Sequence, residues 1–151
     1  MISDMIFRQA TLSDKSAIEE LFMDMLRAIY GEDPKGGYEE DYLLRFFGPS
    51  EDVIIVAENK GEVIGYISVE VKREDREYVY IDDFCVDEKY RSRGIGTKLL
   101  SYSEEAAKNA GIYDILLHVE ESNLPARRLY ERSGYELLRK DNTRLLMVKH
   151  L

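Results

Sequence analysis

A run with two closely spaced glycines, Arg91-Ser92-Arg93-Gly94-Ile95-Gly96-Thr97, constrains this chain more than any other segment. It follows a strand-like stretch, Tyr78 to Val86, and it opens an amphipathic helix. Glycines at a helix start let the backbone approach a ligand closely, and the first N–H groups of the helix have no carbonyl partner. Those amides, the positive end of the helix dipole and two arginines predict an anion site that suits a pyrophosphate.

The loop differs from two common phosphate-binding loops. The string G-x-x-x-x-G-K-[ST] of nucleotide hydrolases is absent. The dinucleotide fingerprint G-x-G-x-x-G fails because Leu99 stands where the third glycine belongs. The pattern that remains is R-x-x-G-x-G, formed by Arg91, Gly94 and Gly96. Taken alone, it also fits an ordinary strand-to-helix turn.

A second motif follows in the next strand and helix. After the stretch Tyr113 to Glu120 comes N-x-x-A-x-x-x-Y, formed by Asn123, Ala126 and Tyr130, and then the pair Gly134-Tyr135. The two motifs, in this order, resemble the acetyl-coenzyme A (acetyl-CoA) loop and the helix after it in the GNAT superfamily of N-acetyltransferases. The resemblance covers residues 78–137 closely and the rest of the chain in the order of its elements.

Length and composition bound the class of protein. A chain of 151 residues is long enough to bury a core, and we expect one N-acetyltransferase domain over residues 1–151. The net charge of −9 disfavours nucleic acid and anionic membranes as partners. The acidity either aids solubility or attracts a cationic substrate. A single cysteine, and no signal peptide or membrane span in the sequence, predict a cytoplasmic protein.

Hydrophobic periodicity, glycines and prolines predict the order of the elements. Strands are expected at residues 5–10, 53–57, 63–71, 78–86, 113–120, 135–139 and 144–150. Helices are expected after Thr11, over Tyr38 to Phe47, after the glycine loop and after Asn123. The crossover from residue 78 to 120 requires parallel pairing, and the hairpins require antiparallel pairing. We therefore expect an α/β (α+β) fold, GNAT-like, with a mixed, mostly antiparallel twisted sheet of about six to seven strands flanked by about four helices.

The resemblance implies roles for residues of the later helix and of the strand before the loop. Tyr130 would protonate the departing thiolate, although the pattern alone also fits a core aromatic residue. Asn123 is a good helix N-cap, and the resemblance adds a contact with the pantetheine arm of the cofactor. A backbone N–H near Cys85 or Val86 would polarise the thioester carbonyl. The Cys85 thiol itself is read as buried and structural.

Three residues compete for the role of general base. Asp82 matches an acidic residue of polyamine acetyltransferases. His118, with Tyr80, matches a pair found in some protein N-terminal acetyltransferases, and histidine suits proton transfer near neutral pH. Strand alternation places Tyr80, Asp82 and Phe84 on one face, with Ile81, Asp83 and Cys85 on the other, so only one aspartate can face a cleft. We rank Asp82 first, His118 second and Tyr80 third.

These residues predict an enzyme that moves an acetyl group from acetyl-CoA to a primary amine, by direct attack in a ternary complex. The expected acceptor is a small cationic amine, polyamine or amino-acid-like, bound by Tyr30, Glu32, Asp33 and Asp82. The alternatives are a protein N-terminal or lysine acetyltransferase, and a non-catalytic sensor that binds acyl-CoA. No metal-ligand spacing is present, so no metal is expected. Family members often form homodimers, but no segment of the sequence identifies an interface.

Overall fold

The computed structural model describes residues 4–31 and 41–151. Within these residues, eight strands form one sheet in the order β1-β2-β3-β4-β6-β8-β7, and β5 pairs with β3. Neighbouring strands are antiparallel except β4 and β6, which are parallel. The predicted mixed, mostly antiparallel α/β fold is confirmed, with a slightly higher number of strands than expected.

The elements follow the predicted order. The first half holds β1 (Met5–Gln9), α1 (Lys15–Tyr30), β2 (Val53–Asn59), β3 (Glu62–Lys72), β4 (Tyr78–Ile81) and β5 (Phe84–Val86). The second half holds α2 (Ile95–Asn109), β6 (Asp114–Glu120), α3 (Leu124–Arg132), β7 (Glu136–Asp141) and β8 (Arg144–His150). Short 3-10 helices lie at η2 (Leu12–Asp14), η3 (Tyr42–Phe46) and η4 (Glu88–Tyr90).

The helix expected over Tyr38 to Phe47 differs from the observed structure. In its place lies the 3-10 helix η3, and residues 38–40 fall outside the described part of the chain. Three α-helices therefore remain among the described residues, against the four expected. Gly48 and Pro49 follow directly after this segment, so an α-helix has no room to continue.

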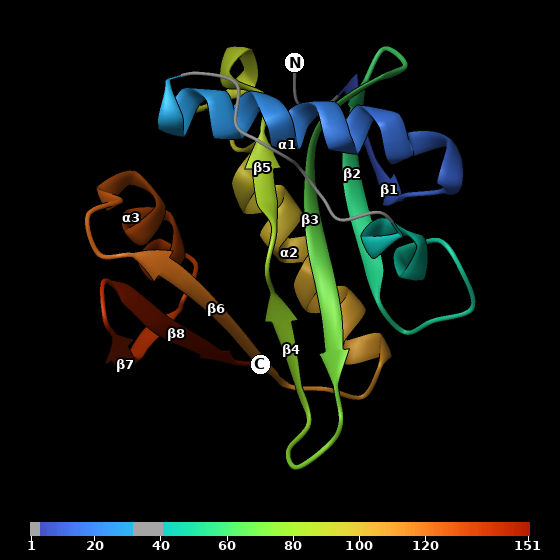
Figure 1. Ribbon diagram of the computed structural model, residues 1–151. Coiled ribbons are helices and arrows are strands. Elements are labelled where there is room, and N and C mark those ends of the chain that lie inside the picture. The colour runs from blue at the N-terminus through green and yellow to red at the C-terminus, as the bar shows by residue number, and fades with distance from the viewer. Residues whose placement is uncertain (1–3, 32–40) are drawn as a thin grey trace.

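Helices cover both faces of the sheet, and each face has its own apolar core. α1 lies across one face, where Ile18 and Leu21 pack with Val56 and Tyr66 (Figure 1). α2 lies behind the other face, and its Leu99 belongs to the core there together with the odd-numbered positions of β6, Ile115, Leu117 and Val119. The even-numbered positions of β6, His118 among them, therefore face the α1 side.

A hydrogen-bonded carboxylate fixes the start of α1. Both oxygens of Asp14 accept hydrogen bonds from the Arg8 guanidinium, at 2.8 and 2.9 Å, and the Thr11 amide donates to the same carboxylate at 2.8 Å. Thr11 and Asp14 form a capping box at this point. Arg8 also reaches Glu58 on β2 at 2.9 Å, so the network ties the helix start to the sheet.

Gly65 of β3 lies where another strand approaches closely. Ala57 pairs with Gly65 but Glu58 pairs with Val63, so the ladder of β2 and β3 contains a bulge here. On its other side Gly65 faces β5, and a Cβ atom added to it would lie 3.1 Å from the Cys85 carbonyl oxygen. β5 can therefore pack this closely only because position 65 carries no side chain.

The expected strand over residues 78–86 is interrupted at Asp82 and Asp83, and this break accounts for the additional strand. The alternation predicted across the break is wrong. Ile81 belongs to the core under α2, whereas Cys85 belongs to the core under α1, and Phe84 packs on the α2 side. Asp82 and Asp83 belong to neither strand. The alternation of side chains between the two faces of the sheet therefore does not continue from β4 into β5.

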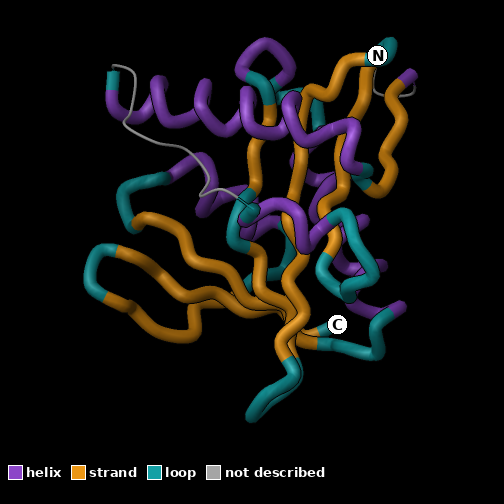
Figure 2. The backbone as a smooth tube through the Cα atoms, turned by 45° about the vertical axis from the view of Figure 1, so that its right-hand side comes forward, coloured by secondary structure: helices purple, strands orange, loops and turns teal. Residues whose placement is uncertain are grey.

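The break also separates the two halves of the sheet. β4 pairs with β6 as far as Ile81 and Leu117, whereas β5 pairs only with β3. Beyond this last pair the strands diverge, as the backbone traces show (Figures 1 and 2). The main chain of Asp83 is held in place by β3, because its carbonyl accepts from the Ser68 amide at 2.8 Å and its amide donates to Ser68 Oγ at 2.9 Å.

Candidate active site

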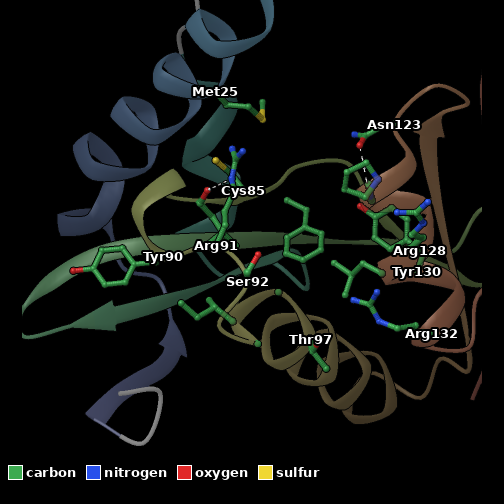
Figure 3. Close-up of a pocket in the computed structure, with 18 of the residues that line it drawn as sticks. Met25, Cys85, Tyr90, Arg91, Ser92, Thr97, Asn123, Arg128, Tyr130 and Arg132 are labelled. Atoms are coloured by element: carbon green, nitrogen blue, oxygen red, sulfur yellow. Dashed lines mark hydrogen bonds between the residues drawn. The ribbon is translucent and has the colours of Figure 1, made fainter.

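A cavity of about 860 Å³ lies where β5 and β6 diverge. Its walls come from β5, the loop after η4, the first turn of α2, the α3 helix and the C-terminal part of α1 (Figure 3). This volume is within the range of cavities that hold small molecules and cofactors. Residues from both sides of the sheet therefore meet in one cleft.

The loop before α2 has the geometry of an anion site. Ser92 and Gly94 both adopt left-handed backbone conformations, with φ of 62° and 82°. The Lys98 amide donates the first helical hydrogen bond, to the Gly94 carbonyl, at 3.1 Å. The amides of residues 95–97 consequently have no carbonyl of their own helix to donate to, and they lie at its positive end.

The cleft collects the predicted cofactor-binding residues, with one exception. The residues that line it are Cys85, Val86, Arg91, Ser92, Gly94, Ile95, Gly96, Thr97, Asn123 and Tyr130. Arg93 is not among the lining residues, and its guanidinium lies over the ring of Tyr90, 5.3 Å from the centroid. Of the two loop arginines, Arg91 is therefore the one that points to the cleft.

Two further arginines, Arg128 and Arg132 of α3, line the cleft but were not predicted as site residues (Figure 3). They lie one helical turn apart, which places both on the same face of α3. This spacing was visible in the sequence, but exposed arginines on a short helix carry no signal of a ligand. Together with Arg91 they give the cleft a positive lining in a protein whose net charge is −9.

Gly96 has a packing role beside the approach to a ligand that the sequence predicted. A Cβ atom at this position would lie 3.3 Å from Leu129 Cδ2 and 3.3 Å from Phe84 Cζ. It would therefore meet apolar side chains of α3 and β5, which themselves line the cleft. The absence of a side chain lets α2, β5 and α3 come together around the cavity, in addition to leaving the loop amides accessible.

Tyr130 is the tyrosine that the second motif singled out. It is 8% exposed, lines the cleft, and packs between the rings of Phe84 and Tyr135 at 6.2 and 5.8 Å. Burial raises the pKa of its hydroxyl to about 12. The phenol therefore keeps its proton at neutral pH and can act as a proton donor inside the cleft.

Asn123 begins α3 as predicted. Its side-chain oxygen accepts a hydrogen bond from the Ala126 amide at 3.3 Å, and Pro125 stands in the first turn. Asn123 also lines the cleft (Figure 3). The residue therefore caps the helix at a point where its side chain is close to a bound ligand.

Cys85 turns toward α1. Its thiol donates to the Leu21 carbonyl oxygen at 3.7 Å, and burial raises its pKa to about 11. A thiol with this pKa is almost fully protonated at neutral pH, so it is a poor nucleophile. This geometry agrees with the structural role that the sequence predicted for the thiol.

The structure brings Tyr80 and His118 together on the α1 side of the sheet. The Tyr80 hydroxyl lies 2.6 Å from His118 Nδ1, and His118 Nε2 lies 3.0 Å from Asp141 Oδ2. Tyr80 stands next to the last β4–β6 pair, and His118 is the first residue of β6 beyond it. The pair is therefore located at the closed end of the gap between the diverging strands, although neither residue lines the cleft itself.

Asp82 is separated from the cleft. It is exposed, and its Oδ2 accepts a hydrogen bond from the Tyr42 hydroxyl of η3 at 3.2 Å. Asp83 is half-buried, and neither aspartate lines the cavity. The other predicted acceptor-binding residues cannot be placed, because Glu32, Asp33 and the Tyr30 side chain lie outside the described part of the structure.

The described residues contain neither a metal-binding cluster nor a membrane-spanning helix. None of the groups of His, Cys, Asp and Glu side chains within them is suited to hold a metal ion. No helix that the structure describes has the length and apolar character to cross a membrane.

Comparison with known proteins agrees with this geometry. Residues 17–135 match the acetyltransferase (GNAT) family. The uncharacterized N-acetyltransferase YhfO of Bacillus subtilis is 36% identical over 140 residues, which cover 87% of this chain and 90% of YhfO. The uncharacterized N-acetyltransferase MJ1530 of Methanocaldococcus jannaschii is 33% identical over 132 residues, 87% of this chain and 78% of MJ1530.

Solved structures share the fold. The PaiA N-acetyltransferase of Thermoplasma acidophilum, in complex with coenzyme A, superposes with a TM-score of 0.82 at 18% identity and covers 97% of this chain and 99% of its own. YncA of Salmonella typhimurium, with acetyl-CoA, has a TM-score of 0.81 at 21% identity, with 98% and 94% coverage. From the family match and the relatives, we conclude that this chain belongs to the GNAT family of N-acetyltransferases.

Proposed function

We propose that the protein transfers the acetyl group of acetyl-CoA to the primary amine of a small cationic acceptor, polyamine or amino-acid-like, by direct attack in a ternary complex. The observation that carries the proposal is the meeting of the loop amides, Arg91 and Tyr130 in one cleft. The acceptor class is supported by the net charge of −9 and by the exposed carboxylate of Asp82 near the closed end of the strand gap.

The donor would enter between β5 and β6. The free amides at the start of α2 and the side chain of Arg91 suit its diphosphate, because both supply positive charge and N–H donors. Arg128 and Arg132 add charge along the opposite wall. The apolar side chains of Phe84 and Leu129 suit the pantetheine arm, and Asn123 supplies one polar contact.

Tyr130 is proposed as the acid. The amine nitrogen bonds to the acetyl carbon as the carbon–sulfur bond breaks, and the departing thiolate takes the proton of the Tyr130 hydroxyl. The nitrogen then loses a proton that restores the phenol. A hydroxyl with a pKa of about 12 holds its proton until a strongly basic sulfur develops beside it.

The acceptor must lose a proton before it attacks, because an ammonium group has a pKa of about 10.4 and no lone pair. We propose that Tyr80 and His118 accept this proton. Their 2.6 Å hydrogen bond supports the proposal, since it connects a phenol to an imidazole that can hold the proton. Asp82, ranked first from the sequence, remains the rival, although its Oδ2 already accepts a hydrogen bond from Tyr42.

A protein N-terminus or lysine is the second candidate for the acceptor. The hydrogen-bonded pair of Tyr80 and His118 favours it, because the sequence resembles protein N-terminal acetyltransferases at these two positions. A peptide would have to approach the α1 side of the sheet, where both side chains point.

The test is thiol release from acetyl-CoA over a panel of amines: spermidine, free lysine, and a short peptide with a free α-amine. We expect turnover with spermidine or lysine. Turnover with the peptide alone would favour the second candidate. Stabilisation against heat by acetyl-CoA, without thiol release for any amine, would support a non-catalytic sensor instead.

Tyr130→Phe tests the acid in the same assay. We expect turnover to fall by about 10²-fold or more, because general acid catalysis contributes this much, while the dissociation constant for coenzyme A stays near the wild-type value. Full activity in this variant would exclude Tyr130 as the acid.

Three wider predictions from the sequence complete the proposal. We propose that residues 1–151 act as a single domain, that the protein works in the cytoplasm, and that it pairs into homodimers. Sedimentation analysis tests the last of these, and a monomer at micromolar concentration would contradict it.

A further inference from the structure

Three side chains of the β7–β8 hairpin lie around the pair of Tyr80 and His118. Asp141 Oδ2 lies 3.0 Å from His118 Nε2, and Arg139 Nε donates to the other oxygen of Asp141 at 2.9 Å. Arg144 Nη2 donates to the Tyr80 hydroxyl at 3.3 Å. A continuous chain of hydrogen bonds thus runs from Arg144 through Tyr80 and His118 to Asp141.

One tight turn supplies both ends of this chain. Asp141 is the last residue of β7, Arg144 is the first residue of β8, and the two form the last pair of the hairpin. Asn142 adopts a left-handed conformation, with φ of 59°, which suits asparagine in a short hairpin. The hairpin therefore holds a carboxylate and a guanidinium next to each other, one for each member of the pair.

The partners determine which nitrogen of His118 carries the proton. Asp141 is ionised, because the hydrogen bonds of His118 and then Arg139 hold its pKa below the usual range. A carboxylate only accepts hydrogen bonds, so His118 Nε2 must donate to it. In neutral imidazole the other nitrogen, Nδ1, is then an acceptor with a free lone pair.

The charges around Tyr80 complete the assignment. Burial raises the pKa of the Tyr80 hydroxyl most, Arg144 lowers it, and Asp82 and Glu70 raise it. The hydroxyl therefore keeps its proton in the resting enzyme and donates it to His118 Nδ1. Its oxygen accepts from Arg144 and has a lone pair left for a proton from the acceptor amine.

We infer that Asp141 and Arg144 are positioning residues of a proton relay that runs from the acceptor amine through Tyr80 to His118; this inference rests on the proposed function of that pair. One proton leaves the ammonium for the Tyr80 oxygen while the Tyr80 proton moves to His118 Nδ1. The amine becomes neutral, the imidazolium forms beside the Asp141 carboxylate, and Arg144 stabilises negative charge on the phenol oxygen during the transfer. After turnover the imidazolium gives its extra proton to solvent.

The relay requires a side chain at position 141 that accepts a hydrogen bond from His118 Nε2 and does not donate one. Asparagine has nearly the shape of aspartate, but its NH₂ group can donate to His118 Nε2 and favour the tautomer with the proton on Nδ1. That tautomer cannot accept from Tyr80. Alanine removes the carboxylate but leaves the imidazole free to choose its tautomer. A relay therefore predicts that Asp141→Asn is more harmful than Asp141→Ala, whereas a merely structural role predicts the reverse.

A second histidine–carboxylate pair offers a matched control. Asp114 Oδ1 lies 2.5 Å from His150 Nδ1, at the other end of β6. No contact of this pair with a tyrosine is present among those that the structure gives for the described residues. Asp114→Asn thus removes a similar contact of the same sheet without touching the relay.

The first measurement is the tautomer of His118 in the full-length protein, read from ¹⁵N-histidine NMR without any ligand. We expect the Nε2–H tautomer in the wild type and in Asp114→Asn, and the Nδ1–H tautomer in Asp141→Asn. An Nδ1–H tautomer in the wild type, or an unchanged Nε2–H tautomer in Asp141→Asn, would overturn the inference. This measurement does not depend on finding the acceptor.

The second measurement is kcat for the best amine of the panel above. We expect losses of about 10²- to 10⁴-fold in Asp141→Asn, smaller losses in Asp141→Ala, and wild-type values in Asp114→Asn. If Tyr80→Phe and His118→Ala are inactive but Asp141→Asn behaves like Asp114→Asn, the positioning role is wrong and the proposed base stands. If Tyr80→Phe and His118→Ala are fully active, the proposed base itself is wrong.

Discussion

Replacing Gly65 with alanine tests whether the close packing of β3 and β5 supports the cleft. A Cβ atom at position 65 would lie 3.1 Å from the Cys85 carbonyl oxygen, 3.4 Å from Leu99 Cδ1 and 3.5 Å from Val86 Cα. The nearest atom belongs to the main chain, so a change of side-chain rotamer cannot relieve the contact. β5 must move, and with it Cys85 and Val86, which line the cleft.

Two opposing effects set the size of the change in stability. Overpacking of a tight core costs about 1–3 kcal/mol of unfolding free energy. Alanine also reduces the conformational freedom of the unfolded chain, which returns about 0.4–1 kcal/mol because Gly65 does not have a positive φ. The midpoints of these two ranges give a net loss of about 1.3 kcal/mol, or a fall in Tm of about 3–5 °C for a protein of this size.

Thermal unfolding followed by circular dichroism measures the loss, and calorimetric titration with coenzyme A measures the effect on the cleft. Gly48→Ala is the control, because its nearest atom, the Leu44 carbonyl oxygen, is 4.0 Å from the added Cβ and its φ is also not positive. We expect Gly65→Ala to be less stable than this control and to bind coenzyme A more weakly. Equal stability of the two variants, with unchanged affinity, would refute the argument.

Three other predictions follow from contacts described above. Gly96→Val should weaken coenzyme A binding by at least about tenfold in a calorimetric titration, because its side chain would meet Phe84 and Leu129; unchanged affinity would contradict this packing. Asp14→Asn should lose about 1–3 kcal/mol of unfolding free energy at pH 7. Arg8 holds the pKa of Asp14 in the folded protein below the ordinary 3.8. The contribution of this carboxylate to stability is therefore complete above pH 3.8 and is lost as the pH falls through the pKa of the folded state. Denaturant titrations in which the variant shows the same acid dependence as the wild type would exclude this explanation. Cys85 should react slowly with iodoacetamide at pH 7.5 and faster as the pH approaches 11, and a fast reaction at neutral pH would contradict its buried environment.

Most residues that the two motifs singled out line one cleft, because both motifs are local. Helix starts, glycine turns and caps are determined by residues within a few positions of each other, so the loop from Arg91 to Thr97 and the cap at Asn123 could be identified directly. The orientation of each side chain was harder to predict. Arg93 lies over Tyr90 instead of lining the cleft, which depends on where η4 places that ring.

The acceptor side was predicted less completely, because its contacts join distant parts of the chain. Tyr80 and His118 were named as candidates, but Asp141 and Arg144 lie in a hairpin turn, where charged residues are usually exposed to solvent. Only the register of β6, β8 and β7 shows that this turn ends beside His118. A single sequence contains no signal for that register.

The two aspartates after β4 suggested a catalytic base from the sequence, and in the structure they mark a break between two strands. Aspartate is rare within strands, which makes Asp82 and Asp83 unusual in the sequence, and the resemblance to polyamine acetyltransferases suggested Asp82 as the base. In the structure they lie outside both strands, with the main chain of Asp83 bonded to Ser68 of β3. Their backbone ends the pairing of β4 with β6 and lets β5 follow β3 alone.

This break lies between the cleft and the proposed relay. Among the described strands, the side of β6 that faced β4 has no partner beyond Ile81 and Leu117, and we propose that the donor lies there, between β5 and β6. His118 is the first residue past that point, and Tyr80 stands just before it. In the proposed mechanism, the position at which the strands separate would set both the depth to which the donor enters and the place where the acceptor amine loses its proton. A change that restored pairing at Asp82 and Asp83 would close the cleft and separate the relay from it at the same time.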